Sequence, residues 1–312
     1  MILTVTMNPS VDISYKLDKF SLDTVNRVND VSKTAGGKGL NVTRVLHQLE
    51  EEVAATGFLG GNLGDFIRNE ISILGIQDFF VGVTGDTRNC IAVIHEGNQT
   101  EILEGGPEIK NEEATSFLES FTSYVQQVEI ITISGSLPIG LPNDFYDDLL
   151  KIAGANNTLV LLDTKGELLE NALISKNKPF LIKPNQEELA DLLGGKFENE
   201  DQIIEALKSP MFEGVPWIVV TLGVDGAMIK SNANVYRVQI PKVKAVNPVG
   251  SGDSVIAGFA AGLSRKLKGE DLIKFGLAMG VLNAIEENTG HINPENINWC
   301  IEQIHVEEIL LY

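Results

Sequence analysis

Short apolar runs alternate with helix-like periods along most of this chain. Residues 2–7 form an apolar run, and after Gly39 apolar residues recur at the i, i+3, i+4 and i+7 positions of an amphipathic helix. Later apolar runs, each followed by polar or glycine-rich residues, occupy positions 130–133, 159–162, 180–182 and 217–220. Because such alternation is typical of βαβ units, the sequence predicts an α/β fold with a central, mostly parallel sheet flanked by helices.

Two stretches interrupt this alternation. Residues 11–35 have mixed polarity and no convincing helical period, and residues 88–104 predict a hairpin around Glu96-Gly97. We expect these two stretches to form a small β lid that projects from the main sheet. No repeat or low-complexity linker separates two units, so residues 1–312 are expected to form a single domain with the lid inserted.

Charge and cysteine content narrow the classes of function. The chain has 24 Lys and Arg against 43 Asp and Glu, a net charge of −19, which disfavours nucleic-acid and anionic-membrane partners. Cys90 and Cys300 lie far apart, and the four histidines are scattered singly, so no disulfide framework or metal-ligand pattern is indicated. No run approaches the about eighteen apolar residues of a membrane span, and we expect a cytoplasmic protein.

The richest segment for chemistry is Gly250-Ser251-Gly252-Asp253, which precedes an apolar, small-residue run. A Gly-Ser-Gly turn can bring successive backbone N–H groups together, and a helix that begins there adds its partial positive charge. The turn therefore predicts an anion site. Asp253 in the first helical turn could accept a proton from a hydroxyl, although an aspartate that only caps a helix has the same pattern.

A second glycine-rich segment, Gly36-Gly37-Lys38-Gly39-Leu40-Asn41, lies directly before the first predicted helix. Glycine lets the backbone approach a sugar or phosphate closely, while Lys38 supplies a charge and Asn41 an amide that can donate and accept. By itself this segment is also compatible with a turn that leads into a helix. Its combination with the Gly-Ser-Gly-Asp segment is more specific.

The chain resembles the PfkB carbohydrate kinases, which have the ribokinase-like fold. The resemblance covers essentially the whole chain and rests on six ordered motifs: Asn8-Pro9-Ser10-Val11-Asp12, residues 36–42, Ser134-Gly135-Ser136-Leu137-Pro138, Lys183-Pro184-Asn185 with Glu188, Thr221-Leu222-Gly223, and residues 250–253. The first two motifs look most like the hexose-phosphate branch. The resemblance implies ATP-dependent phosphorylation of a ketohexose monophosphate, with Mg²⁺ as the metal.

Within that resemblance, the Gly-Ser-Gly-Asp motif corresponds to the catalytic centre. Asp253 matches the base that accepts the hydroxyl proton, while Gly250, Ser251 and Gly252 match the anion hole that faces the migrating phosphoryl group. Phosphoryl transfer depends on positioning and charge neutralisation, which is the chemistry that these residue types supply.

The expected sugar site draws on both ends of the lid. Asp12, Gly37 and Asn41 match the family's sugar-binding positions, and a phosphate on the sugar calls for cations. Lys38, Arg27 and Arg88 are the candidates, since they lie in the glycine loop and the two lid segments. For both arginines a solvated lid surface is the alternative.

The nucleotide side is expected after the later strands. Its candidate residues are Lys183, Asn185, Glu188, Thr221, Gly223 and Asn283, the last of these as a neighbour of adenine. The resemblance gives Glu188 an indirect, water-mediated role at Mg²⁺. Asn185 and Glu188 also have the spacing of a helix capping box, and the two roles are compatible.

The expected acceptor is D-tagatose 6-phosphate, phosphorylated at C1 to the 1,6-bisphosphate as part of lactose and galactose catabolism. Fructose 1-phosphate, phosphorylated at C6, is the alternative, and a non-catalytic sugar-phosphate sensor is the alternative from another class. Asn247-Pro248 stands where many relatives have Asp-Thr, so we do not predict K⁺ dependence. Because an unpaired strand edge promotes pairing between chains, we also expect a homodimer through the lid.

Overall fold

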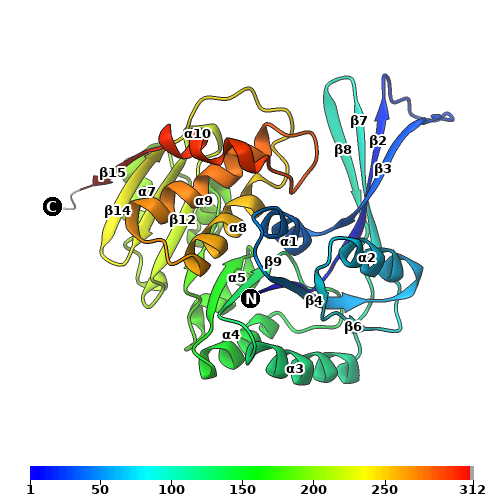
Figure 1. The fold of residues 1–312 in the computed structure, drawn as a ribbon, viewed down its shortest axis with the longest axis horizontal. Helices are drawn as coiled ribbons and strands as arrows, with labels where there is room; N and C mark the ends of the chain where they lie inside the picture. The colour runs from blue at the N-terminus through cyan, green and yellow to red at the C-terminus, as the bar shows by residue number, and fades with distance from the viewer. Residues whose placement is uncertain (310–312) are drawn as a thin grey trace.

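The computed structural model describes residues 1–309, and eleven of the strands in that range form its main sheet (Figure 1). In spatial order the strands are β15 (His305–Ile309), β14 (Asn234–Gln239), β13 (Ala227–Ser231), β12 (Trp217–Thr221), β11 (Leu181–Ile182), β10 (Leu159–Asp163), β9 (Ile130–Ser134), β1 (Ile2–Thr6), β4 (Val53–Leu59) and β5 (Gln77–Asp78), with β6 (Val81–Gly82) also paired to β4. Neighbouring strands pair in parallel along the sheet from β12 to β5, and β6 is also parallel to β4. The remaining pairs, from β12 through β13 and β14 to β15, are antiparallel. The predicted α/β class with a mostly parallel sheet is therefore confirmed.

Helices cover both faces of this sheet. On one face are α1 (Lys38–Gln48), α8 (Ser251–Ser264), α9 (Gly269–Ala284) and α10 (Ile297–Glu302). On the other face are α3 (Asn111–Val125), α4 (Phe145–Ala155), α5 (Glu167–Ile174), α6 (Gln186–Leu193) and α7 (Glu200–Ala206). The remaining helix, α2 (Gly61–Ile73), packs against a second, smaller sheet that is described below. The helix expected after Gly39 is α1.

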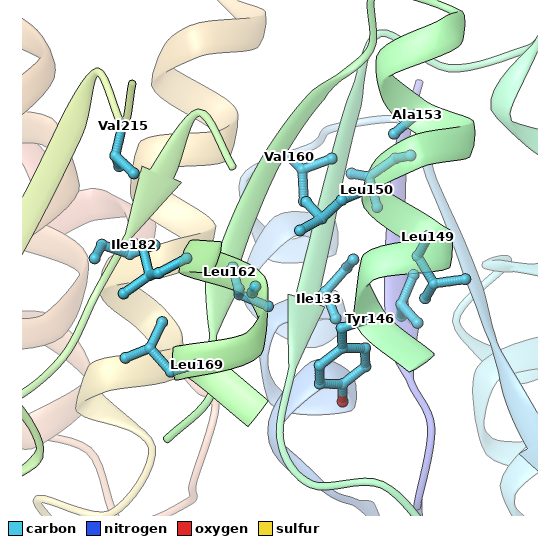
Figure 2. Packing of buried hydrophobic residues seen from close by; sticks show 14 of the residues in the cluster. Ile133, Tyr146, Leu149, Leu150, Ala153, Val160, Leu162, Leu169, Ile182 and Val215 are labelled. Carbon is cyan, nitrogen blue, oxygen red and sulfur yellow. The ribbon is translucent and has the colours of Figure 1, made fainter. Parts of the chain in front are cut away.

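Alternation along the central strands builds a core on each face. Leu3 and Val5 of β1 face the cluster shared with α3 and α4, whereas Ile2 faces α1 and α8. Figure 2 shows the first cluster, where Tyr146 of α4 lies beside Ile133 of β9 and Leu150 of α4 lies beside Val160 of β10. Burying a side chain of this size contributes about 1.5–3 kcal/mol, so the two cores fix the strand ends in space.

The lid is a four-stranded sheet in the order β3 (Asp30–Gly36), β2 (Ser10–Leu17), β7 (Arg88–His95) and β8 (Asn98–Leu103). β2 and β7 are parallel, and each has an antiparallel outer neighbour. The hairpin expected around Glu96-Gly97 joins β7 to β8. In Figure 1 this sheet projects away from the body, and α2 packs under its base through Ile67 and Ile71.

No helix among residues 1–309 is both long and apolar enough to cross a membrane. Cys90 and Cys300 are free thiols.

Candidate active site

The candidate site lies at the carboxyl edge of the parallel strands, where open α/β sheets bind ligands. Asp163 is the last residue of β10, and Lys183 follows the end of β11. The chain also enters α1 and α8 near this edge, through the glycine segment at 36–39 and the turn at 248–252. Packing of α1 against α8 brings together residues at this edge that are more than two hundred positions apart.

Asp253 and Asn41 meet at the centre of this site. Asn41 Nδ2 donates a hydrogen bond of 2.7 Å to Asp253 Oδ2, and both side chains are buried. Burial and the negative charge of Asp163 raise the pKa of Asp253 to about 6, although Lys38, Asn41 and Lys183 oppose that shift. Asp253 is thus an acid that ionises close to neutral pH, as a general base requires.

The turn before α8 has backbone N–H groups that are available to bind an anion. Gly250 adopts φ +82°, a left-handed conformation that glycine takes without strain. Ser251 N–H donates to Pro248 O at 3.2 Å and Ser254 N–H to Gly250 O at 2.9 Å, but the N–H groups of Gly252 and Asp253 have no acceptor within residues 1–309. Two free N–H groups at a helix start can bind negative charge.

Asn283 of α9 supports this turn through side-chain hydrogen bonds. Its Nδ2 donates to Val249 O at 2.9 Å and to Ser251 Oγ at 3.3 Å, and its Oδ1 accepts from Gly290 N–H at 2.8 Å. The side chain is 0% exposed. Its amide is engaged by the turn and by Gly290, so the geometry favours a supporting role for Asn283 over the expected position beside adenine.

Two lysines share one buried carboxylate. Lys38 Nζ lies 3.4 Å from Asp163 Oδ2, and Lys183 Nζ lies 3.3 Å from Asp163 Oδ1. Burial raises the pKa of Asp163, but the two ammonium groups outweigh it and lower the pKa overall. Asp163 in turn raises the pKa of Lys38. Of the two lysines, Lys183 lies beside the turn, since a Cβ on Gly252 would lie 3.0 Å from its Nζ.

The glycine loop meets Asp12 of β2. Ser10 Oγ donates to Asp12 Oδ1 at 2.6 Å, and burial raises the pKa of the Asp12 carboxyl. A Cβ on Gly36 would lie 2.0 Å from Asp12 Cγ, so only glycine fits there. Gly37, with φ +102°, donates its N–H to the same carboxylate. Asp12 and Gly37 therefore lie together, as expected for the sugar site.

The two lid arginines have different surroundings. Arg88 donates to Asn8 O at 3.0 Å and Glu104 O at 2.8 Å, and it lines an open pocket of about 560 Å³ together with Asn62, Leu63, Asp86, Thr87, Asn89, Glu104, Gly105 and Gly106. Arg27 is exposed in the loop between β2 and β3, and within residues 1–309 no hydrogen bond or ion pair joins it to the other candidate residues. The structure brings Arg88 close to the site but leaves Arg27 outside it.

The remaining candidates lie where β11 and β12 end. Asn185 Oδ1 accepts from Glu188 N–H at 2.8 Å, and Glu188 Oε2 accepts from Asn185 N–H at 3.0 Å, which is the capping box of α6. Thr221 bridges to Asn185, and its N–H donates to Pro184 O at 3.1 Å. Gly223 begins the short 3-10 turn that follows β12.

Two residues of the site were not predicted from the sequence. Asp163 ends an apolar run, and a strand-end carboxylate is a weak but usable signal for a ligand edge. Arg44 of α1 donates to Asn41 Oδ1 and Ala35 O, and to Thr289 O at 3.3 Å. In sequence it reads as one more charged residue of an amphipathic helix. Among residues 1–309 no cluster of three or more His, Cys, Asp or Glu side chains could hold a metal ion.

Comparison with known proteins gives consistent matches over nearly the whole chain. The model of the pfkB family of carbohydrate kinases matches residues 5–296. A curated tagatose-6-phosphate kinase from Staphylococcus epidermidis is 50% identical over 310 residues, which cover 99% of this chain and 100% of the relative.

Two solved structures superimpose over the same length. One, titled a putative phosphofructokinase from Staphylococcus aureus, has a TM-score of 0.85 and 32% identity over 99% of each chain. The other, titled a possible 1-phosphofructokinase from Thermotoga maritima, has a TM-score of 0.90 and 26% identity over 99% of each chain.

Proposed function

This chain belongs to the pfkB family of carbohydrate kinases, and from that premise we propose that it transfers the γ-phosphoryl group of ATP to the C1 hydroxyl of D-tagatose 6-phosphate. The observation that carries the choice of sugar is the 50% identity to a tagatose-6-phosphate kinase over 99% of the chain. The product would be D-tagatose 1,6-bisphosphate, an intermediate of lactose and galactose catabolism.

In the proposed reaction Asp253 acts as the general base. As the C1 oxygen forms its bond to the γ-phosphorus, the bond from phosphorus to the β–γ bridging oxygen breaks, the hydroxyl proton passes to Asp253, and ADP leaves. The raised pKa of Asp253 suits this transfer, because a stronger base takes the proton more readily while still ionised near neutral pH.

The turn at 250–252 would stabilise the charge that develops on the phosphoryl oxygens. The free N–H groups of Gly252 and Asp253 are fixed before reaction, so they need no reorganisation when the charge moves. Lys183 lies beside Gly252, where it can neutralise the transferred group, and Lys38 lies on the opposite side of Asp163. Ser251 is held by Asn283 and keeps the turn in shape.

The sugar would bind between the glycine loop and the lid. Asp12 and Asn41 can hydrogen-bond its hydroxyls, and Gly37 allows close approach of the backbone. Arg88 and Lys38 are the proposed partners of the 6-phosphate. Arg27 is a further candidate for that phosphate, but it could act only if its loop came closer than the described structure has it.

We propose that Lys183, Asn185, Thr221 and Gly223 face the nucleotide, and that Glu188 acts on Mg²⁺ through water. The residues fit the metal, because Glu188 Oε2 serves the capping box while Oε1 has no partner in residues 1–309. When bound, Mg²⁺ would neutralise charge on the triphosphate. The charge of Glu188 also helps to raise the pKa of Lys38, so the two side chains lie close enough to interact.

We further propose that residues 1–312 act as one kinase domain in the cytoplasm, and that two copies pair through their lids. Both outer lid strands are exposed, and Val31 is 44%, Ile102 57% and Leu103 61% exposed. Exposed apolar strand edges favour pairing. Sedimentation of the protein and of the Ile102→Glu variant tests the dimer, which the variant should weaken. A monomeric parent protein would exclude it.

The function is tested by coupled ADP release with tagatose 6-phosphate, fructose 1-phosphate, fructose 6-phosphate and ribose as acceptors. We expect the highest kcat/KM for tagatose 6-phosphate. Phosphorylation of fructose 1-phosphate at C6 is the second candidate, since the Thermotoga maritima structure shares the fold at a TM-score of 0.90. Equal kcat/KM values for the two sugars would contradict the first choice.

A further inference from the structure

Arg44 hydrogen-bonds to Asn41, the side chain that contacts the candidate base Asp253. It has no part in the reaction described so far. It is one turn along α1 from Asn41, and its guanidinium donates to three acceptors: Asn41 Oδ1, Ala35 O, and Thr289 O at 3.3 Å. Enclosure lowers the pKa of this guanidinium, whereas the charges of Asp12 and Asp253 raise it. Arg44 is therefore a cation that three hydrogen bonds hold in place next to the candidate site.

The Asn41 amide is placed between Arg44 and Asp253. Its Oδ1 accepts from the guanidinium, and its Nδ2 donates to Asp253 Oδ2 at 2.7 Å. Guanidinium can only donate, and an ionised carboxylate can only accept. If the amide turned over, its oxygen would face the carboxylate and its NH₂ group would face the guanidinium, so both hydrogen bonds would become repulsive contacts.

We propose that Arg44 is a positioning residue that fixes the orientation of the Asn41 amide, so that the amide donor faces the base Asp253. The inference rests on the proposed function, because it assigns Arg44 an effect only through that base. Without the guanidinium, only the contact with Asp253 would orient the amide, and the flipped orientation would lose one of its two penalties. In the flipped one, Asp253 would lose its hydrogen-bond donor and face an amide oxygen.

Arg44 also connects the glycine loop to residue 289, but a second residue secures that region. Gln48 Nε2 donates to Gly290 O at 3.2 Å, and Gln48 Oε1 accepts from Ile292 N–H at 2.8 Å. Loss of Arg44 therefore leaves the 290–292 segment attached to α1. Of the three contacts of Arg44, the one to Asn41 Oδ1 is the one that leads directly to Asp253.

The test is a double-mutant cycle on the full-length enzyme with Arg44→Met, Asn41→Ala and the double variant. We expect Arg44→Met to lower kcat by about 100-fold, as misplacement of a catalytic group does, while KM for ATP stays within about twofold. In the double variant kcat should match that of Asn41→Ala, because Arg44 has nothing left to orient. A double variant whose loss equals the product of the two single losses overturns the proposal.

Two further variants separate positioning from folding. Arg44→Lys keeps the charge and can reach one acceptor, so it should recover part of kcat relative to Arg44→Met. Arg265→Met removes another arginine that ties α1 to α8, through Leu49 O and Glu51, with no contact to Asn41. It should lower the unfolding midpoint and leave kcat unchanged. An equal loss of kcat in Arg265→Met and Arg44→Met would reduce Arg44 to a structural role.

Asp253→Ala distinguishes failure of this inference from failure of the proposed function. If Asp253→Ala keeps the parental kcat, Asp253 is not the base, and both conclusions fall. If it abolishes turnover while the cycle is multiplicative, the base stands and the positioning role of Arg44 alone is wrong.

Discussion

Lys183 Nζ lies 3.3 Å from Asp163 Oδ1, with both side chains at 5% exposure or less. Water screens such a pair weakly, so its charges act on neighbouring groups at nearly full strength. The nearest acid that they affect is Asp253, whose pKa Asp163 raises and Lys183 lowers. Burial is the main cause of the raised pKa of Asp253, and the pair adds two opposed contributions to it.

The first prediction concerns pH. With the pKa of Asp253 raised to about 6, the base is protonated below that pH, and kcat/KM should fall as pH decreases through about 6. Asp163→Asn removes a negative neighbour, lowers the pKa of Asp253 and should move this acid limb to lower pH. The same variant leaves two lysines without their partner and should lose about 3 kcal/mol of stability.

The control for this experiment is Asp78→Asn, which breaks an ion pair with Arg68 on the outer side of the molecule. Its acid limb should coincide with that of the parent. An Asp163→Asn profile that also coincides with the parent would show that Asp163 does not act on the base.

The second prediction concerns the base itself. Asp253→Asn should lower kcat by about 10²–10⁴-fold. It should also raise the free energy of unfolding at pH 7.5 by about 2 kcal/mol, because an acid with a raised pKa in the folded state destabilises the fold once it ionises. Urea denaturation and steady-state kinetics on the same sample check both outcomes. A variant that is less stable than the parent would contradict the assigned burial cost.

The third prediction uses Gly36, where a Cβ would collide with the Asp12 carboxylate at 2.0 Å. Gly36→Ala should displace Asp12, raise KM for the sugar phosphate by about tenfold and cost about 1–3 kcal/mol of stability. Gly195→Ala is the matched control, because a Cβ there has nothing within 4 Å. Equal sugar KM values in the two variants would refute the role given to the Gly36–Asp12 contact.

The fourth prediction separates the two roles of Glu188. Gln at this position can still accept from Asn185 N–H, so Glu188→Gln should keep the capping box and change stability by less than about 0.5 kcal/mol. The loss of charge should raise the Mg²⁺ concentration needed for half-maximal rate. Asn199→Ala, which removes the cap of α7, should cost about 1 kcal/mol without changing that concentration. An unchanged Mg²⁺ requirement in Glu188→Gln leaves the cap as its only role.

The fifth prediction concerns Asn283. Asn283→Ala should leave Gly290 N–H unpaired in the interior and remove the side-chain donor of Val249 O, with a loss of about 1–3 kcal/mol, and should lower kcat because the turn at 250–252 loses its support. Asn296→Ala, at a position with no side-chain cap bond, should change neither quantity. If Asn283→Ala instead raises KM for ATP alone, the residue contacts the nucleotide as the sequence first indicated.

The fold could be predicted because the hydrophobic pattern that indicates each strand or helix lies within the residues of that element. The apolar runs before Ser134 and Asp163 became β9 and β10, and the period after Gly39 became α1. The run at 180–182 formed only the two-residue β11, since Pro184 cannot donate to a neighbouring strand and the chain turns there.

The site could be predicted only in part. Glycines and acids in recognisable motifs, such as Gly252 and Asp253, can be identified as candidate site residues from the sequence. Arg44 cannot, because its sequence position marks it only as a charged residue of an amphipathic helix, and its contacts with Asn41 and Thr289 appear only in the folded structure. The strand-end position of Asp163 is a weak signal that does not reveal the two lysines it meets. Asn283 was expected beside adenine, and neither its complete burial nor its contacts with the turn at 248–252 could be foreseen from one polar residue in an apolar helix.

The hydrogen bond between positions 41 and 253 joins the first and last thirds of the chain. A polypeptide that ends at residue 240 has the glycine loop and the lid strands but lacks the proposed base, because Asp253 lies in the first turn of α8. On the proposed function, a truncated product of this chain should therefore transfer no phosphoryl group until α8 is made and packs against α1.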